Sequence, residues 1–508
     1  MKNIMGFIYN GTTITYNDIP ELELTRFLQT IIDATGLGWR VVTYFGIPGN
    51  GKTSLCCIMA YKVEGQLGIM RTTVCGDRFP SIAELCPQVQ LFEREISEQC
   101  GIIAEDHPWF KPVRFHKSFV NGINAWGQPA NEQAKAGAMD FYQVKGEEVH
   151  EVAVGPVHAG IIEPGHFRFQ CHGEKVFHLE ISLGYQHRGI EQAMTGGPYP
   201  RSLSMMETVA GDTTIGHTQA YCMIMESLSG TRSPACAEGL RGIALELERL
   251  ANHTGDLGAI SGDVGYLPTA SFCGRIRGDF LNMSAVLCGS RFGRGFITPG
   301  GTVFTLSLDQ RDHLLKSLEH AGKDLASAVD LLWKTQSVMS RLEGAGELSP
   351  VSAEELGLVG PAARACGLKR DVRHDYPFGI FRMSHIPMAT GYHGDVCARA
   401  MIRWQEAQKS IAFISDQLRH MPAGAHRKEA AASTLSCGKL SVAMTEGWRG
   451  EICHVAVTDE TGRFLRYKIT DPSFHNWQGL AMAMRDQQIS DFPLCNKSFN
   501  LSYCGFDL

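Results

Sequence analysis

The sequence lacks any run of apolar residues long enough to cross a membrane as a helix. Such a helix needs about 20 consecutive, mostly apolar residues. The first residues, MKNIMGFIYNGTT, also lack the apolar core of a signal peptide. We therefore expect a soluble, cytoplasmic chain that reaches a membrane only through other proteins.

An excess of positive charge is also missing. The chain has 47 lysine and arginine residues against 53 aspartate and glutamate residues, and its formal net charge is -6. This balance provides no electrostatic attraction for nucleic acid or for anionic lipid. We therefore expect no nucleic-acid partner.

The 16 cysteines include no CxxC pair, a spacing that is typical of metal sites. Most of them lie inside apolar runs such as SLCCIMAY and AVLCGSRF. A buried free cysteine packs as a small hydrophobic residue. The cysteines therefore predict apolar packing rather than a disulfide framework or a metal cluster.

A chain of 508 residues is longer than one hydrophobic core usually supports. Residues 119–149 are polar and small and show no sustained periodicity, which is typical of a linker. We therefore divide the chain into a first unit (1–118), a linker (119–149) and a second unit (150–508).

One stretch of the first unit matches a phosphate-binding motif. GIPGNGKT (Gly46 to Thr53) fits the pattern GxxxxGK[ST], which needs a strand before it and a helix after it to direct backbone N–H groups at phosphates. The residues that follow, SLCCIMAYKV, are rich in β-formers, so the flanks predict a strand, a PGNG turn and a second strand. We expect no nucleotide site at Gly46–Thr53.

The second unit opens with a stretch rich in ionisable residues. GPVHAGIIEPGHFRF places His158, Glu163, His166 and Arg168 among glycines and prolines. The residues that follow alternate between polar and apolar around Gly173 and Glu174, which predicts a β-hairpin with this loop at its base. A charged loop anchored on a hairpin is a common form of functional site, and a solvated surface loop is the alternative.

Three later segments show the apolar period of a helix. They are 237–260, 303–343 and a segment that begins at Asp395. A C-terminal region, TEGWRGEICHVAVTDETGRFLRYKIT, alternates as strands around a turn at Asp459–Gly462. The predicted fold is therefore α+β, with a small N-terminal α/β scaffold domain and a large, mainly helical-bundle domain that carries peripheral antiparallel β-hairpins.

Arg399 and Arg403 lie four residues apart and share one face of the third helix. Two arginines on one face suit an acidic partner, or the electrostatics of an iron–sulfur cluster in a docked subunit. Solvated surface charge is the alternative interpretation.

Several motifs of the second unit resemble a known family. The sequence from Gly155 to Glu191, with GPVHAGIIEPGHFRF and LGYQHRGIE, resembles the large-subunit family shared by nickel–iron hydrogenases and the 49-kDa subunit of respiratory complex I. The likeness is closest to the membrane-bound, energy-converting hydrogenases. It continues in RGIALELERLANHTGDLGAISGDVGYL, RFGRGFITPGG, GPAARACGLKRDVRHDYP, GDVCARAMIR, TDPSFHNWQGL and DFPLCNKSFNLSYCG, and so covers nearly all of residues 150–508.

The first unit resembles the 30-kDa subunit of complex I over Phe79 to Phe115. That resemblance implies a small α+β scaffold without a cofactor. Glu93, Arg94 and Glu95 are expected on a short amphipathic helix, where they would be structural or would contact a neighbouring subunit. A solvated helix face is the alternative.

The resemblance also indicates what the second unit has lost. In the hydrogenases, cysteines in an ERxCGxC segment and in a C-terminal DPCxxC segment hold the nickel–iron centre. The matching positions here carry Ala210, Thr213, Ser473 and Asn476. Nickel and low-spin iron need soft, anionic sulfur ligands, which these side chains do not offer. We therefore expect no metal centre in this chain and no nickel–iron hydrogenase activity.

The family's proton-handling groups are in part retained. Glu163 matches the glutamate that passes protons at the hydrogenase metal, and His158, His166 and His217 are expected to act with it as a proton relay. Glu207 and His475 are further members if these groups converge. The residues expected to line the same cavity are Tyr221, Arg168, Asp471 and Ser473. The alternative is that each histidine is an ordinary core or surface residue.

Quinone is the one cofactor that the resemblance leaves open. In complex I a tyrosine of this segment and a loop histidine hold the quinone head group. The tyrosine position falls here at Gly211, so Tyr221 or a histidine would have to serve instead. We expect the chain itself to bind no other cofactor, and an iron–sulfur cluster to lie in a partner subunit.

The resemblance implies a subunit of a complex I-like or energy-converting-hydrogenase-related oxidoreductase on the cytoplasmic side of the inner membrane. The expected partners are a small iron–sulfur subunit and membrane subunits that resemble antiporters and complex I. Quinone binding, NAD binding and electron transport are the functions implied for such a complex. The alternative is a non-catalytic scaffold that couples the other subunits.

Overall fold

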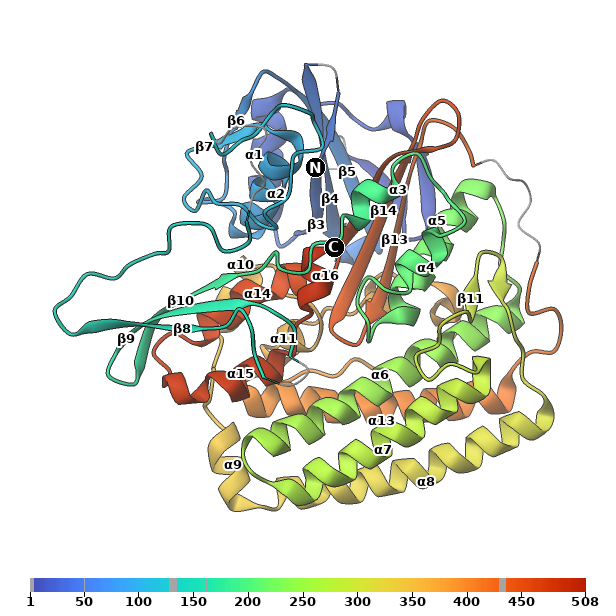
Figure 1. Ribbon diagram of the computed structural model, residues 1–508. Coiled ribbons are helices and arrows are strands. Elements are labelled where there is room, and N and C mark those ends of the chain that lie inside the picture. The colour runs from blue at the N-terminus through green and yellow to red at the C-terminus, as the bar shows by residue number, and fades with distance from the viewer. Residues whose placement is uncertain (1–3, 50, 128–134, 160–161, 429–434) are drawn as a thin grey trace.

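An antiparallel sheet forms the N-terminal part of the computed structural model, which describes residues 4–49, 51–127, 135–159, 162–428 and 435–508 (Figure 1). Its strand order is β1-β5-β4-β3. The strands are β1 (Gly6–Tyr9), β3 (Arg40–Pro48), β4 (Lys52–Tyr61) and β5 (Gln66–Cys75), and the helices α1 (Leu24–Gly36) and α2 (Gln90–Cys100) accompany them. The model as a whole mixes helices with antiparallel sheets, which confirms the predicted α+β class.

The phosphate-motif match lies in the hairpin that joins β3 to β4. Pro48 pairs with Thr53 across the hairpin, and Lys52 begins β4 and is exposed. Asn50, in the predicted turn, lies outside the described residues. The prediction of a strand on each side of the motif is therefore confirmed, and the helix that a phosphate cradle needs does not follow it.

The predicted hairpin of the second unit is confirmed. Strands β9 (His166–His172) and β10 (Lys175–Ser182) pair antiparallel, and His172 faces Lys175 across the Gly173–Glu174 turn. A third strand, β8 (Val149–Val154), pairs with β9, and the three strands project from one side of the molecule (Figure 1). In the described part of the interval between β7 (Ile103–Glu105) and β8, the chain forms no helix or strand.

A second four-stranded sheet joins the two ends of the chain. Its order is β15-β14-β13-β2, with strands β2 (Thr12–Thr15), β13 (Lys439–Gly447), β14 (Gly450–Thr458) and β15 (Phe464–Thr470). Thr12 pairs with Val442, so a strand from the first unit completes a sheet of the large unit. The predicted turn at Asp459–Gly462 connects β14 to β15, which confirms the alternating strands of this region.

Long helices pack side by side at the end opposite the N-terminal sheet (Figure 1). They are α6 (Ala235–Asp263), α7 (Leu267–Cys288), α8 (Leu308–Trp333) and α13 (Val396–His420). The expected apolar stripes of α6 and α8 are buried. Among the described residues, no helix combines the length and the apolar character that crossing a membrane requires.

The segment 303–343 forms two helices rather than the single expected one. Ser307 caps α8 by accepting a hydrogen bond from Gln310, whose side chain bonds back to the Ser307 N–H. The helix ends at Trp333, and Thr335 has an extended backbone before α9 (Gln336–Leu342) begins. The apolar period continues through this break because α9 buries Val338 and Leu342 on the same side of the chain.

The remaining elements are short. The helices are α3 (Ile190–Met194), α4 (Ser202–Met206), α5 (Thr214–Ser229), α10 (Pro350–Glu355), α11 (Gly360–Ala365), α12 (Val372–Asp375), α14 (Pro472–Ala483), α15 (Phe492–Phe499) and α16 (Tyr503–Asp507). The strands are β6 (Arg78–Pro80), β11 (Ile297–Thr298) and β12 (Gly301–Thr302). Single turns of 3-10 helix span Tyr16–Asp18, Lys62–Glu64, Pro87–Val89, Gly379–Arg382 and Ile489–Asp491.

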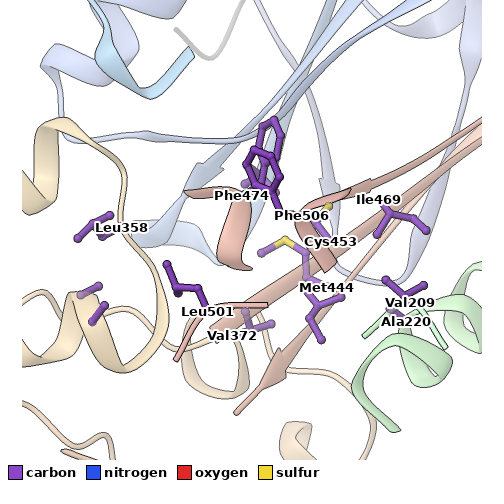
Figure 2. Packing of buried hydrophobic residues seen from close by; sticks show 14 of the residues in the cluster. Val209, Ala220, Leu358, Val372, Met444, Cys453, Ile469, Phe474, Leu501 and Phe506 are labelled. Carbon is purple, nitrogen blue, oxygen red and sulfur yellow. The ribbon is translucent and has the colours of Figure 1, made fainter. Parts of the chain in front are cut away.

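The core continues from the strands of the C-terminal sheet into the surrounding helices. Figure 2 shows Phe474 of α14 stacked on Phe506 of α16, with ring centroids 5.2 Å apart. Met444 and Ile469 of the sheet belong to the same buried cluster. Eleven of the 16 cysteines are buried and none forms a disulfide, which confirms apolar packing for most of the thiols.

The structural role expected as one possibility for Glu93, Arg94 and Glu95 is confirmed, and the solvated face is wrong. All three lie on α2 as predicted, but they are buried inside this chain. Glu93 accepts hydrogen bonds from the first residues of the loop after β6, Arg94 donates to the carbonyls of Lys111 and Pro112, and Glu95 pairs with basic side chains. Charged residues on one face of a helix indicate a solvent-exposed face only when no hydrogen-bonding or oppositely charged group of the same chain packs against it.

The expectation for Arg399 and Arg403 was also wrong. Both side chains are buried on α13, where Arg399 donates to Ser498 and Arg403 pairs with Asp256 of α6. Neither arginine is available to an acidic partner or to solvent. The two residues hold α13 against its neighbours instead.

Candidate functional site

A chain of buried polar side chains runs between α5, the C-terminal sheet and α14. Nε2 of His217 lies 3.1 Å from Oδ2 of Asp471, and Nδ1 of the same ring lies 3.0 Å from Nε2 of His454. Nδ1 of His454 lies 2.9 Å from the hydroxyl of Tyr467. We call these four residues the His217 chain. His217 is on α5, His454 and Tyr467 are on adjacent strands, and Asp471 caps α14.

The His217 chain has two complementary proton arrangements. With neutral rings, Tyr467 donates to His454, His454 donates to His217, and His217 donates to the Asp471 carboxylate. One proton added to His217 reverses the bond between the two histidines and the bond to Tyr467, so that His217 donates to His454 and His454 donates to the Tyr467 oxygen. A hydrogen-bonded chain that is satisfied in both states can pass a proton from end to end.

Electrostatics favour a carboxylate at one end and neutral groups at the other. Burial alone would raise the pKa of Asp471, but the hydrogen bond from His217 and the charge of Arg449 outweigh it, and the pKa is lowered. Burial and the neighbouring His217 hold the pKa of His454 well below its usual value. Burial raises the pKa of the Tyr467 hydroxyl well above its usual value.

The four positions that match the hydrogenase cysteines are buried beside this chain. Ala210 has no polar side-chain atom. The Thr213 hydroxyl lies 3.1 Å from Nε1 of Trp448, which donates to it. Ser473 Oγ accepts from the backbone of Ser502, and Asn476 makes two hydrogen bonds with the backbone of Val359.

These residues do not fit a nickel–iron centre. None is a thiolate, and the three polar side chains are already hydrogen-bonded to other residues of the chain. Asp212, between Ala210 and Thr213, is held by Arg449 through paired bonds of 2.6 and 2.8 Å. Among the described residues no group of three or more histidine, cysteine or acidic side chains is arranged to hold a metal ion.

Glu163 lies against the C-terminal segment, which separates it from the His217 chain. Its Oε2 accepts from the backbone N–H of Tyr503 at 3.3 Å, and its side chain also contacts the Cys504 thiol. Ser502 of the same segment bonds to Ser473. A side chain at Gly505 would collide with Asp471, because its Cβ would lie 2.7 Å from the carboxyl carbon. Residues 160–161 of the loop lie outside the described residues.

The other predicted residues divide among separate places. His158 contacts the carbonyl of Gly165 within its own loop. His166 accepts from Arg168, whose guanidinium also pairs with Glu151 of β8, so both belong to the hairpin rather than to the His217 chain. Burial lowers the pKa of His166. The structure therefore does not bring His158, His166 and His217 together as one relay.

Tyr221 lies at the tyrosine end of the His217 chain. Its ring centroid is 6.2 Å from that of Tyr467, and it hydrogen-bonds to Ser202. Glu207 instead accepts from the backbone of Gly295. His475 lies on the opposite side of α14, where its ring packs edge-on to Phe92 at 5.7 Å.

His454 and Tyr467 were not predicted as site residues. They lie in the alternating run EICHVAV and in RYKIT, where each occupies an inward-facing strand position. A histidine and a tyrosine at buried positions of neighbouring strands are a weak signal, because the register that pairs Ala456 with Tyr467 is not visible in the sequence.

Two family models match this sequence. Residues 263–440 and 437–507 match the family model of the 49 Kd subunit of respiratory-chain NADH dehydrogenase, and residues 23–129 match that of its 30 Kd subunit. The two matches lie in one polypeptide.

Similar proteins include hydrogenase and respiratory subunits. The carbon monoxide-induced hydrogenase of Rhodospirillum rubrum is 34% identical over 69% of this chain and 97% of its own length. Formate hydrogenlyase subunit 5 of Escherichia coli is 27% identical over 84% of this chain and 77% of its own. NADH-quinone oxidoreductase subunit 4 of Thermus thermophilus is 28% identical over 68% and 90%. The chain belongs to the family of the respiratory-chain NADH dehydrogenase 49-kDa subunit and its hydrogenase relatives, with a 30-kDa-subunit-like region fused ahead of it.

Proposed function

We propose that this chain is the proton-handling subunit of a membrane-bound, complex I-like oxidoreductase complex that works without a nickel–iron centre. It would lie on the cytoplasmic side of the membrane, beside a small iron–sulfur subunit and above antiporter-like subunits. Electrons would come from the partner's cluster. Residues 1–118 would form the 30-kDa-like domain, 119–149 the linker and 150–508 the domain that carries the site.

The His217 chain is the observation that supports this proposal best. Four side chains from four elements form an unbroken series of contacts of 2.9 to 3.1 Å in the core, with the carboxylate next to Ser473, which matches a hydrogenase cysteine. Packing alone does not require two buried histidines to contact each other. Each buried ring nitrogen must keep a hydrogen-bond partner in both protonation states, and a second histidine meets that need only if its own protons rearrange.

A quinone is the electron acceptor that the family relationship favours for such a complex. His158 and Glu163, which lie in one loop, are the groups of this chain that would meet its head group, His158 by donating a hydrogen bond to a carbonyl oxygen. Tyr221 lies at the tyrosine end of the His217 chain and Arg168 pairs with Glu151 on the hairpin, so neither shares that place. The rest of the binding site would come from the iron–sulfur partner.

The test uses the purified complex with Asp471→Asn. Asparagine keeps the shape but removes the carboxylate that accepts the hydrogen bond from His217, so we expect proton-coupled turnover to fall by about 100-fold while the partner's cluster is reduced at the normal rate. Asp416→Asn, which changes an exposed carboxylate on α13, is the matched control and should leave turnover unchanged. Normal turnover in Asp471→Asn would overturn the proposal.

The scaffold alternative predicts a different result. A subunit that only couples its neighbours should tolerate loss of every proton-handling group, so full turnover with Glu163→Gln combined with His166→Ala, and with Asp471→Asn, would support it. Metal analysis of the complex provides a separate check. We expect iron from the partner's cluster and no stoichiometric nickel, and nickel bound to this polypeptide would contradict the absence of a metal centre.

A further inference from the structure

A cavity of about 60 Å³ lies where the β-hairpin of the second unit meets α2 and α14. Strand β10 lines it with residues 178–182, α2 with Leu91 and Arg94, and α14 with Trp477 and Gln478. Most of the lining side chains are apolar. The volume suits about four to six water molecules or a ligand of similar size, because one water needs about 10–15 Å³.

Three of the lining side chains carry a buried polar atom that has no hydrogen-bond partner in the described part of the chain. These atoms are Nε2 of His178, Oγ of Ser182 and Nε1 of Trp477. Ser182 and Trp477 are each only 3% exposed. A buried polar atom without a partner is costly, so three of them around one cavity indicate a polar occupant.

The unpartnered atoms show which kind of group this occupant must carry. The indole N–H of Trp477 can only donate, and the Ser182 hydroxyl is able to donate. Burial lowers the pKa of His178 against the opposing charge of Glu180, so its ring is neutral at pH 7 and donates at most one hydrogen bond. The positive charge of Arg485 also acts on His178. The cavity therefore suits a ligand with hydrogen-bond acceptors.

Arg94 adds a positive charge to the same wall. Its Nε donates to the carbonyl of Lys111 at 2.7 Å and its Nη2 to the carbonyl of Pro112 at 2.9 Å, which holds the guanidinium in place. Burial lowers the pKa of Arg94 to about 10, so the side chain stays charged at neutral pH. Among the described residues it contacts no carboxylate as an ion-pair partner.

The carboxylates nearest to Arg94 already have other partners. Glu180 lines the cavity, but its Oε1 accepts from Lys111 at 2.8 Å and its Oε2 accepts from the backbone N–H of Tyr142 at 2.7 Å. Glu98, one turn along α2, accepts from backbone N–H groups and does not line the cavity. Both act on Arg94 only from a distance, so its guanidinium is available to an anionic ligand.

We propose that this cavity binds one small free carboxylate, of about four to six non-hydrogen atoms, whose charged end faces Arg94, Ser182 and Trp477. Its apolar end would lie against the apolar wall. A quinone ring with its substituents is larger than this volume, so the cavity is separate from any quinone site. It shares no side chain with the His217 chain, so each of the two proposals stands or fails separately.

The experiment is saturation-transfer difference NMR of the intact complex, with propionate as the probe. We expect a propionate signal that saturates with concentration. Propionamide has nearly the same shape but no charge, so it should bind at least about ten-fold more weakly, because hydrogen bonds to a charged group are the stronger ones. The proposal is overturned if propionate gives no saturable signal or if propionamide binds as tightly.

Two variants place the binding in this cavity. Trp477→Phe removes the indole N–H and keeps an aromatic ring, and Ser182→Ala removes only one oxygen, so the second still tests the proposal if the first does not assemble. Each should weaken propionate binding by about ten-fold. Trp333→Phe is the matched control, because Trp333 also has a buried N–H without a partner in the described part of the chain but lies at the end of α8. Unchanged binding in Ser182→Ala, or equal losses in Trp477→Phe and Trp333→Phe, would overturn the proposal.

Discussion

At the scale of single residues, His475 shows how burial turns a titratable side chain into a pH-dependent contribution to stability. It is buried in α14, and burial together with the nearby charge of Arg40 lowers its pKa to about 3. In the unfolded chain a histidine takes up its proton at a pH of about 6.5. The unfolded state therefore binds the proton first as the pH falls, and folding loses free energy through this interval.

We predict that the free energy of unfolding decreases as the pH falls below about 6.5, with His475 contributing about 1.4 kcal/mol for each pH unit. His475→Gln keeps an N–H donor for the carbonyl of Val42 but does not titrate. Between about pH 6.5 and 5 the unaltered chain should lose about 2 kcal/mol more than this variant. Urea unfolding at the two pH values measures the difference.

His320→Gln provides the control for this pH series. His320 lies on α8 with an exposed side chain, so its replacement should leave the pH dependence of unfolding unchanged. Equal pH slopes for the unaltered chain and His475→Gln would show that His475 is protonated in the folded state as easily as in the unfolded one.

At the scale of single residues, the sequence predicts only some of the contacts of the site. His217 and Asp471 were both expected near the family's cavity, and they contact each other. Their continuation through His454 and Tyr467 depends on strand register, and neither residue belongs to a local motif. Glu163 and His166 are three residues apart, but Glu163 bonds to the backbone of Tyr503 from the loop, whereas His166 begins β9 and accepts from Arg168 of the same strand.

At the scale of elements, α6 and α13 are joined by a buried ion pair rather than by apolar contacts alone. Nε of Arg403 donates to Asp256 at 2.5 Å, and both side chains are buried. Removing one member of such a pair leaves the other charge in the core without compensation.

We predict that Arg403→Met destabilises the chain by about 3–5 kcal/mol, because Asp256 then keeps only Asn500 as a side-chain partner. Arg275→Met, which breaks surface pairs with Asp279 of α7 and Asp324 of α8, should cost at most about 1 kcal/mol. The midpoints of urea unfolding compare the two variants. A loss for Arg403→Met as small as that for Arg275→Met would show that water reaches the Asp256 carboxylate.

Apolar periodicity predicted the helices well but does not indicate what lies opposite their polar faces. The stripe of α6 that includes Leu240 and Leu247 is buried as expected. Arg241 and Arg249 on the remaining faces are equally buried, because carboxylates of other elements lie opposite them. A helix wheel records which residues are charged but not whether a distant segment supplies the counter-charge.

At the scale of the whole molecule, the two fused units share structure that neither completes alone. Strand β2 of the first unit covers the edge of β13 from Lys439 to Val442. Arg40 pairs with Glu451, and Lys468 of β15 donates to Glu95 of α2. These partners are separated by hundreds of residues, and no local pattern links them. Sequence resemblance identified both units, whereas their shared sheet became visible only in the structure.

We predict that residues 135–508, expressed without the first unit, associate or aggregate instead of remaining monomeric. An uncovered β13 exposes backbone donors and acceptors that pair readily with another chain, and Lys468 loses the Glu95 half of its buried pairing. Co-expression with residues 1–127 should restore a one-to-one complex. Size-exclusion chromatography with light scattering distinguishes these states.

The control is the full chain cut once within the interval 119–149 after folding, which should stay associated because the shared sheet and the buried ion pairs survive the cut. Residues 135–508 that are monomeric and unfold at the same urea concentration as the full chain would contradict the prediction. That result would mean that β2 and the Arg40–Glu451 pair contribute little free energy, and the two units would then be independent domains joined only by a linker.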